Sequence, residues 1–147
     1  MTTFEKLDFI ADSVNPALVA LTIIFIVYNY IRQGVKTRKK NLIYFLLAIV
    51  CVYVLRFLDS KFKWGLSFGL DYSTHTALSL VCTMCLVKLS RKLQLLWWTA
   101  WLMYLLLMLY QGYHTIMDIV STSVVLITVL FFLDKIFNRL FFHKKAV

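Results

Sequence analysis

The stretch Leu93–Tyr110, LQLLWWTAWLMYLLLMLY, contains no charged residue and is the clearest indication of the fold class. A helix that crosses the hydrocarbon core of a bilayer needs about 20 mostly apolar residues, so this stretch predicts a membrane-spanning helix. Four further apolar stretches flank it and are separated by short polar segments. They lie at residues 16–31, 41–58, 73–89 and 114–133. The sequence therefore predicts about five transmembrane helices.

Composition supports this fold class and excludes several others. The chain has 147 residues, of which 61% are hydrophobic and 16% charged, whereas a soluble domain is nearer half apolar and a quarter charged. We expect one all-α domain over residues 1–147, an integral membrane helical bundle that could act as a monomer or a homo-oligomer. The cysteines lie inside apolar stretches and are expected to be small core residues rather than disulfide partners: Cys51, Cys82 and Cys85.

Basic residues determine the expected orientation of the bundle. They gather in three clusters, at residues 32–40, 88–92 and 135–145, and five spans place all three on one side. Lysine and arginine are enriched on the cytoplasmic side of membrane proteins, so this side is expected to be cytoplasmic. The segment 59–72 would then face the outside of the cell inner (plasma) membrane. These clusters explain the net charge of +9 as membrane anchoring, and no nucleic-acid partner is expected.

The termini and the tryptophans give further expectations. Asn15 and Pro16 predict the start of the first membrane helix, because asparagine caps helices and proline fits a first turn. Residues 1–15 would form a short outer segment, and residues 134–147 a basic cytoplasmic tail. Tryptophans near the start of the fourth stretch predict an aromatic belt at the membrane surface: Trp97, Trp98 and Trp101.

Ionisable residues in so apolar a chain are candidates for function, because they are costly inside a membrane. His114 and Asp118 lie four residues apart and would share one face of a helix. A carboxylate placed there accepts the imidazole N–H, fixes the tautomer and leaves the other ring nitrogen as a directed nucleophile or base. The alternative is a histidine–aspartate pair that only joins helices.

A second histidine and several cations are expected at the same end of the bundle. His75 follows Ser73 and Thr74 at the start of the third stretch, where hydroxyls and free amides of a helix start form a natural anion site. Basic residues at the end of the second stretch would balance the charge of a bound phosphate: Arg56, Lys61 and Lys63. The two lysines could equally be anchors at the membrane surface.

In their order along the chain, these residues resemble the type 2 phosphatidic acid phosphatase (PAP2) superfamily. That family has three motifs, Lys-x6-Arg-Pro, Pro-Ser-Gly-His and Ser-Arg-x5-His-x3-Asp. The resemblance covers about residues 56–118. The corresponding segments here are Arg56-x6-Lys63, Tyr72-Ser73-Thr74-His75 and His114-x3-Asp118.

The chain departs from the family pattern at several motif positions. Trp64 replaces the proline of the first motif, and Thr74 replaces the glycine of the second. In the third motif, Met108 stands at the position of the arginine and Leu107 at that of the serine. Loss of one charge donor of this kind costs on the order of a hundredfold in rate, so a slow or specialised member is one expectation.

The resemblance implies a metal-independent lipid phosphatase with no cofactor, acting at the outer face. By analogy, His114 attacks phosphorus and forms a phosphohistidine, Asp118 orients it, and His75 protonates the leaving group. The substrate would be an amphiphilic phosphate-bearing lipid whose tail stays among the membrane lipids. The phosphoryl oxygens would be held by side chains and backbone amides of Arg56, Lys63, Ser73 and Thr74.

Other functions remain open at this point. Thr76 after His75 and Thr115 after His114 also resemble the sphingomyelin synthase branch, which implies a lipid phosphotransferase. A bis-histidine haem protein would use the same two histidines as axial ligands. A non-catalytic membrane scaffold or small transporter would need neither histidine.

Overall fold

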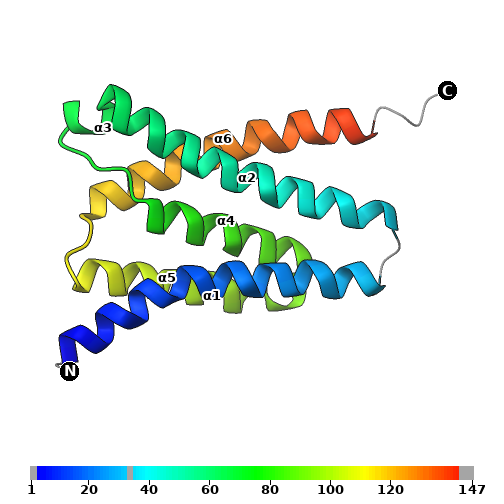
Figure 1. Cartoon of the computed structure of the whole chain (residues 1–147), viewed down its shortest axis with the longest axis horizontal. Coiled ribbons are helices and arrows are strands. Elements are labelled where there is room, and N and C mark those ends of the chain that lie inside the picture. Colours follow the sequence, from blue (N-terminus) through cyan, green and yellow to red (C-terminus); the bar gives the residue numbers. More distant parts are fainter. Residues whose placement is uncertain (1–2, 33–34, 143–147) are drawn as a thin grey trace.

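The structure is a computed structural model that describes residues 3–32 and 35–142. The described part of the chain is helical apart from short connections, and its helices form one elongated bundle (Figure 1). The elements are α1 (Thr3–Arg32), α2 (Val35–Phe62), the short α3 (Trp64–Ser67), α4 (Thr74–Leu89), the 3-10 turn η1 (Arg91–Leu93), α5 (Gln94–Tyr110) and α6 (Ile116–Phe142).

Within the described part of the chain, four helices are long and apolar enough to cross a membrane, whereas the sequence predicted about five. The spans are Glu5–Asn29, Lys39–Phe62, Arg91–Tyr110 and Ile116–Leu140. The predicted third stretch corresponds to α4, which is apolar but has only 16 residues. A helix of this length extends about 24 Å, a little less than the hydrocarbon core of about 30 Å.

The short helix α4 lies at the centre of the bundle and packs against α1, α2, α5 and α6. Small side chains make this possible, because they let neighbouring helix backbones approach closely in a membrane protein. Ala77, Ser79 and Cys82 have no exposed surface, and Cys85 is also buried. The expectation that the cysteines in this helix are small core residues is confirmed, and both are free thiols.

The prediction that Asn15 and Pro16 start the first membrane helix is wrong. α1 continues through Pro16 and bends in its first half (Figure 1), so residues 3–15 belong to this helix rather than to a separate segment. Proline is tolerated in membrane helices where neighbouring groups satisfy the backbone positions that it frees. The carbonyl that loses its helical partner is that of Asp12, and next to it the Tyr104 hydroxyl of α5 donates to the carbonyl oxygen of Ala11 at 3.4 Å.

Other helix boundaries also differ from the prediction. α6 begins at Ile116, so His114 precedes the helix instead of opening it. The same helix runs to Phe142, so the expected tail is helical as far as that residue, and 143–147 lie outside the described residues. α2 begins at Val35, before the predicted position 41. Lysine and arginine are good helix formers, so a helix need not end where its apolar stretch ends.

The tryptophans near the start of α5 do not form the predicted belt. Nε1 of Trp97 donates to the Ser90 hydroxyl at 2.7 Å, and Nε1 of Trp101 donates to the Ser79 hydroxyl at 3.1 Å. Trp98 is exposed, whereas the other two are partly buried. Two of the three indoles therefore bond to α4, one to the buried Ser79 and one to Ser90 at the end of the helix.

The bundle has two chemically different ends (Figure 1). At one end α2 and α5 terminate and α1, α4 and α6 begin. At the other end lie the basic residues that the structure describes in the three predicted clusters, where Lys88 and Asp134 form an ion pair of 2.9 Å. The side chains of Arg32, Lys36 and Arg38, and residues Lys144 and Lys145, lie outside the described part.

Candidate functional site

Five ionisable side chains from different elements converge at the end of the bundle where α4 and α6 begin. Arg56 lies near the end of α2, Asp71 precedes α4, and His75 lies in the first turn of α4. His114 lies in the turn before α6, and Asp118 lies in the first turn of α6. The charges of the other four residues all act on His114. Arg56, His75, His114 and Asp118 therefore lie near one another at this end of the bundle.

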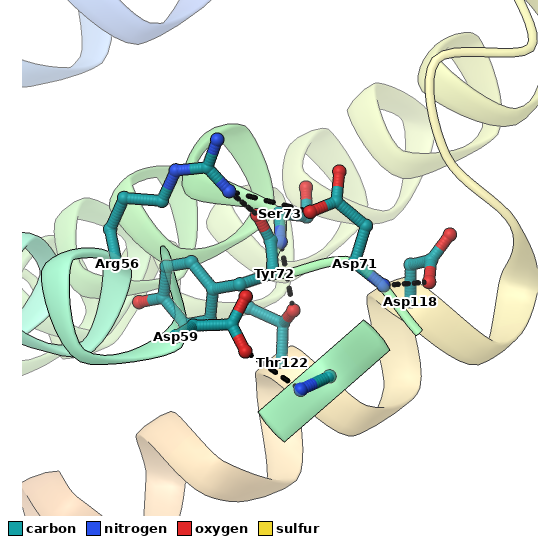
Figure 2. A network of polar contacts seen from close by, with 8 residues as sticks. Arg56, Asp59, Asp71, Tyr72, Ser73, Asp118 and Thr122 are labelled. Atoms are coloured by element: carbon teal, nitrogen blue, oxygen red, sulfur yellow. Dashed lines mark hydrogen bonds and ion pairs between the residues drawn. The ribbon is translucent and has the colours of Figure 1, made fainter. Parts of the chain in front are cut away.

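Arg56 pairs with the connection that leads into α4 (Figure 2). Its Nη1 lies 3.3 Å from Oδ1 of Asp71 and donates to the carbonyl oxygen of Tyr72 at 3.4 Å. The side chains of Arg56 and Asp71 are 46% and 59% exposed, so their ion pair contributes at most about 1 kcal/mol. A phosphate group can therefore compete with Asp71 for the guanidinium at little cost.

Asp118 is buried and accepts hydrogen bonds from two directions. Its Oδ1 accepts from the backbone N–H of Asp71 at 2.7 Å (Figure 2), and its Oδ2 accepts from the backbone N–H of Thr115 at 2.8 Å and the Thr115 hydroxyl at 2.7 Å. The N–H of Asp118 donates in turn to that hydroxyl at 3.2 Å. This reciprocal pattern is a capping box, which satisfies backbone groups at the start of α6.

The predicted pairing of His114 with Asp118 on one helix face is therefore wrong in its geometry. His114 is not helical, and both Asp118 oxygens are used by Asp71 and Thr115. Within the described part of the chain no hydrogen bond joins His114 to Asp118, and the two interact through charge. Asp118 does not bond to the imidazole because the unpaired N–H groups at the start of α6 need an acceptor, and its carboxylate provides one.

The environment of His114 favours the neutral imidazole. Burial lowers the pKa of His114 below its usual value. Asp71 and Asp118 oppose this shift as nearby anions, whereas His75 and Arg56 add to it as cations. A neutral imidazole at pH 7 has a free lone pair on one nitrogen, which is the form required of a nucleophile or base.

His75 lies between the site and α1. Its ring meets the ring of Tyr113 edge to face, with centroids 6.2 Å apart. Its carbonyl oxygen accepts from Nδ2 of Asn15 at 3.4 Å. The Tyr113 hydroxyl donates to the Asp8 carboxylate, and this bond raises the pKa of Tyr113 to about 12. His75 is therefore held between α1 and the turn that contains His114.

Ser73 has a structural role that differs from the predicted phosphate contact. It is buried and caps α4, with its hydroxyl accepting from the N–H of Thr76 at 3.2 Å. Its own N–H donates to the Thr122 hydroxyl of α6 at 3.0 Å, so this amide is not free for a ligand (Figure 2). Thr74 begins α4, and the described hydrogen bonds leave its N–H and that of His75 without an acceptor.

Lys61 and Lys63 are exposed at the end of α2. Among the described residues, no hydrogen bond or ion pair joins either ammonium group to the other site residues. Lys63 has a left-handed backbone with φ of 53°, and its N–H donates to the carbonyl oxygen of Asp59 at 2.7 Å. Oδ1 of Asp59 accepts from the N–H of Gly65 at 2.8 Å, where an added Cβ would lie 2.7 Å from the Leu70 carbonyl oxygen.

Two amide side chains near the site were not predicted as site residues. Asn15 is 5% exposed, and its Nδ2 also lies 3.3 Å from the Tyr104 hydroxyl, but its Oδ1 has no hydrogen-bond donor among the described residues. Gln111, just before the turn with His114, has both amide atoms buried and equally without partners there. Asn15 could have been found from the sequence, because it is a polar residue inside an apolar helix. Gln111 has no sequence feature that marks it as a site residue.

Comparison of the chain with protein-family models, with curated proteins and with solved structures finds no match. Among the described residues, no group of three histidine, cysteine, aspartate or glutamate side chains could hold a metal ion.

Proposed function

We propose that the chain is an integral membrane enzyme that removes the phosphate headgroup of an amphiphilic lipid through a phosphohistidine. The observation that supports this most is the convergence of His75, His114 and Arg56 at one end of the bundle. In this arrangement a half-buried imidazole of lowered pKa lies beside a second imidazole and an exchangeable guanidinium.

The proposed reaction uses the two imidazoles in sequence. A ring nitrogen of neutral His114 attacks phosphorus, and the bond from phosphorus to the lipid oxygen breaks. Protonated His75 gives its proton to that leaving oxygen. Water then attacks the phosphorus of the phosphohistidine, transfers a proton to His75 and releases inorganic phosphate. The same intermediate would serve a phosphotransferase if a lipid alcohol replaced water.

Cations near the site would stabilise the charge of the transferring group. Arg56 would leave its exposed ion pair with Asp71 and bind the phosphoryl oxygens. The free N–H groups of Thr74 and His75 at the start of α4 would also donate hydrogen bonds to the phosphoryl oxygens. Lys61 and Lys63 would act as exposed cations that reach the headgroup. Asp118 would position the turn containing His114 through Thr115, rather than bind the imidazole directly.

We also propose that α4 completes five membrane crossings, which places the histidine end at the outer face. The basic end would then lie in the cytoplasm, as expected from the enrichment of lysine and arginine there. A helix slightly shorter than the hydrocarbon core is accommodated by local thinning of the bilayer. The substrate would lie with its phosphate at headgroup level beside His114.

The test is release of inorganic phosphate from a panel of lipid phosphates by the detergent-purified full chain. His114→Ala should abolish release, whereas His143→Ala, which alters the third histidine outside the predicted site, should retain it. Product analysis with an added diacylglycerol or ceramide acceptor distinguishes hydrolysis from transfer. Absence of both products from the wild-type chain across the panel would overturn the proposal.

A second candidate is a protein that binds a phosphate-bearing lipid without turnover. The internal hydrogen bonds of Asp118 and Ser73 favour it, because they occupy groups that the family resemblance assigns to catalysis. This candidate predicts saturable lipid-phosphate binding that depends on Arg56, with no phosphate released and no phosphoenzyme formed.

A further inference from the structure

A lateral crevice of about 510 Å³ lies between α1, α4 and α5. Along α5 it extends from Trp97 to Leu107, about 15 Å at the helical rise per residue. Val14 and Leu18 of α1 form its opposite wall. Two of the three helices are among those long and apolar enough to cross a membrane, and the crevice residues on them lie within these candidate spans.

Hydrogen bonds connect the lining of the crevice to the candidate site. Tyr104 lines the crevice, and its hydroxyl accepts from Nδ2 of Asn15 at 3.3 Å. The same amide donates to the carbonyl oxygen of His75. Oδ1 of Asn15 is buried and has no donor among the described residues, although an unpaired buried acceptor costs about 1–3 kcal/mol. Asn15 therefore connects Tyr104 of the crevice lining with His75 of the candidate site through hydrogen bonds.

We infer that the crevice binds the hydrocarbon tail of the phosphate-bearing lipid, and that Oδ1 of Asn15 accepts a hydrogen bond from a hydroxyl or amide N–H next to that tail. The inference rests on the proposed function, because it assigns the apolar part of the same substrate. Apolar and aromatic walls suit a hydrocarbon chain, and the connection through Tyr104 and Asn15 leads to His75, the proposed acid.

A second cavity near the site suits a tail less well. It has about 230 Å³, less than half the volume of the crevice, and lies between α2 and α6, with Asp59, Asp71 and Val125 among its mostly apolar lining. This cavity provides a control position for the test.

The kinetic test fills each cavity in turn and varies the length of the substrate tail. Ala100 lines the crevice, so Ala100→Phe should raise KM for palmitoyl lysophosphatidic acid about tenfold, as expected when about two methylenes lose their burial. KM for the butyryl analogue should stay unchanged. Ala20→Phe, at an exposed α1 position outside the crevice lining, is the matched control and should leave both values unchanged.

A binding test works without turnover. In a Trp64→Phe, Trp98→Phe background the remaining indoles, Trp97 and Trp101, both line the crevice. Lysophosphatidic acid brominated in mid-chain, added at low mole fraction to phosphatidylcholine nanodiscs, should quench their fluorescence saturably. Ala100→Phe should remove the saturable component, whereas Val125→Phe should retain it.

The outcomes separate this inference from the proposed function. Phosphate release with no tail-length effect of Ala100→Phe and with non-saturable quenching would overturn the crevice assignment alone. The crevice assignment would also be overturned if Val125→Phe, rather than Ala100→Phe, raised KM for the palmitoyl substrate and left KM for the butyryl analogue unchanged. Saturable quenching that Ala100→Phe removes, without phosphate release by any variant, would support the crevice and overturn the enzymatic function.

Discussion

The carboxylate of Asp118 accepts a hydrogen bond of 2.7 Å from the backbone N–H of Asp71, which lies 47 positions earlier in the chain. This bond joins the start of α6 to the connection that leads into α4. The same connection pairs with Arg56, and the turn preceding α6 contains His114. Asp118 therefore determines how the proposed nucleophile and the proposed phosphate-binding cation lie relative to each other.

Replacement of Asp118 should reduce stability through this connection. Asp118→Ala leaves the N–H of Asp71 and both donors of Thr115 without an acceptor, so we expect a loss of about 2–3 kcal/mol. Asp118→Asn keeps one acceptor oxygen and should lose about half as much. Thermal unfolding in detergent measures both. Asp134→Asn at the opposite end is the control, because its exposed ion pair should cost less than about 1 kcal/mol. Equal melting temperatures for wild type and Asp118→Ala would contradict the prediction.

The pH profile of phosphate release should reflect the lowered pKa of His114. As pH falls through that pKa, the imidazole gains a proton and loses its nucleophilic lone pair, so kcat/KM should decline only below the usual histidine value of about 6.5. Arg56→Gln removes a cation that lowers this pKa, and the acid limb should move to higher pH. Asp71→Asn removes an anion that raises it, and the limb should move to lower pH. Shifts in the same direction for both variants would refute this assignment.

The two histidines should have distinct roles. His114→Ala should abolish both turnover and any acid-labile phosphoenzyme, because it removes the proposed nucleophile. His75→Ala should slow reaction with lipid alcohols most and with p-nitrophenyl phosphate least, because nitrophenolate needs little protonation. Trapping of the phosphoenzyme in both variants provides the measurement. A labelled intermediate that persists in His114→Ala and disappears in His75→Ala would reverse the roles.

Two substitutions of Lys63 distinguish the effect of its charge from the effect of its backbone conformation. A non-glycine residue in the left-handed conformation costs about 1 kcal/mol, so Lys63→Gly should leave stability unchanged or raise it by up to that amount. Lys63→Ala loses the same charge but keeps the strain. If the ammonium group contacts phosphate, both variants should raise KM equally. A KM change in only one of them would assign the effect to the backbone instead.

The orientation in the membrane can be tested with reporters at both ends of the chain. The start of α1 and the end of α6 lie at opposite ends of the bundle (Figure 1), so the two termini should report opposite sides. The amino terminus should face outside and the carboxyl terminus the cytoplasm. Reporters on the same side would mean an even number of crossings, and a cytoplasmic amino terminus would exclude the outer-face site.

Local chemistry was enough to predict the helical class and the end of the bundle at which Arg56, His75 and His114 gather. Apolar stretches such as Leu93–Tyr110 specify membrane helices because the requirement for backbone hydrogen bonding in lipid is met within each helix. Arg56 lies near the end of α2, His75 in the first turn of α4, and His114 just before α6. Helices that traverse a bundle in alternating directions bring such ends together, so this convergence could be predicted without knowing which helices touch.

The hydrogen-bond partners could not be predicted in this way. Asn15 appeared to be a helix cap, but its amide bonds to Tyr104, which lies 89 positions later. Asp118 bonds to the Asp71 backbone, and the Trp97 and Trp101 indoles bond to Ser90 and Ser79 of α4. Each of these groups has several acceptable partners when its own segment is considered alone. Which one it finds depends on how α4 packs among its four neighbours, because a buried polar group must take a partner within hydrogen-bond reach or remain unpaired.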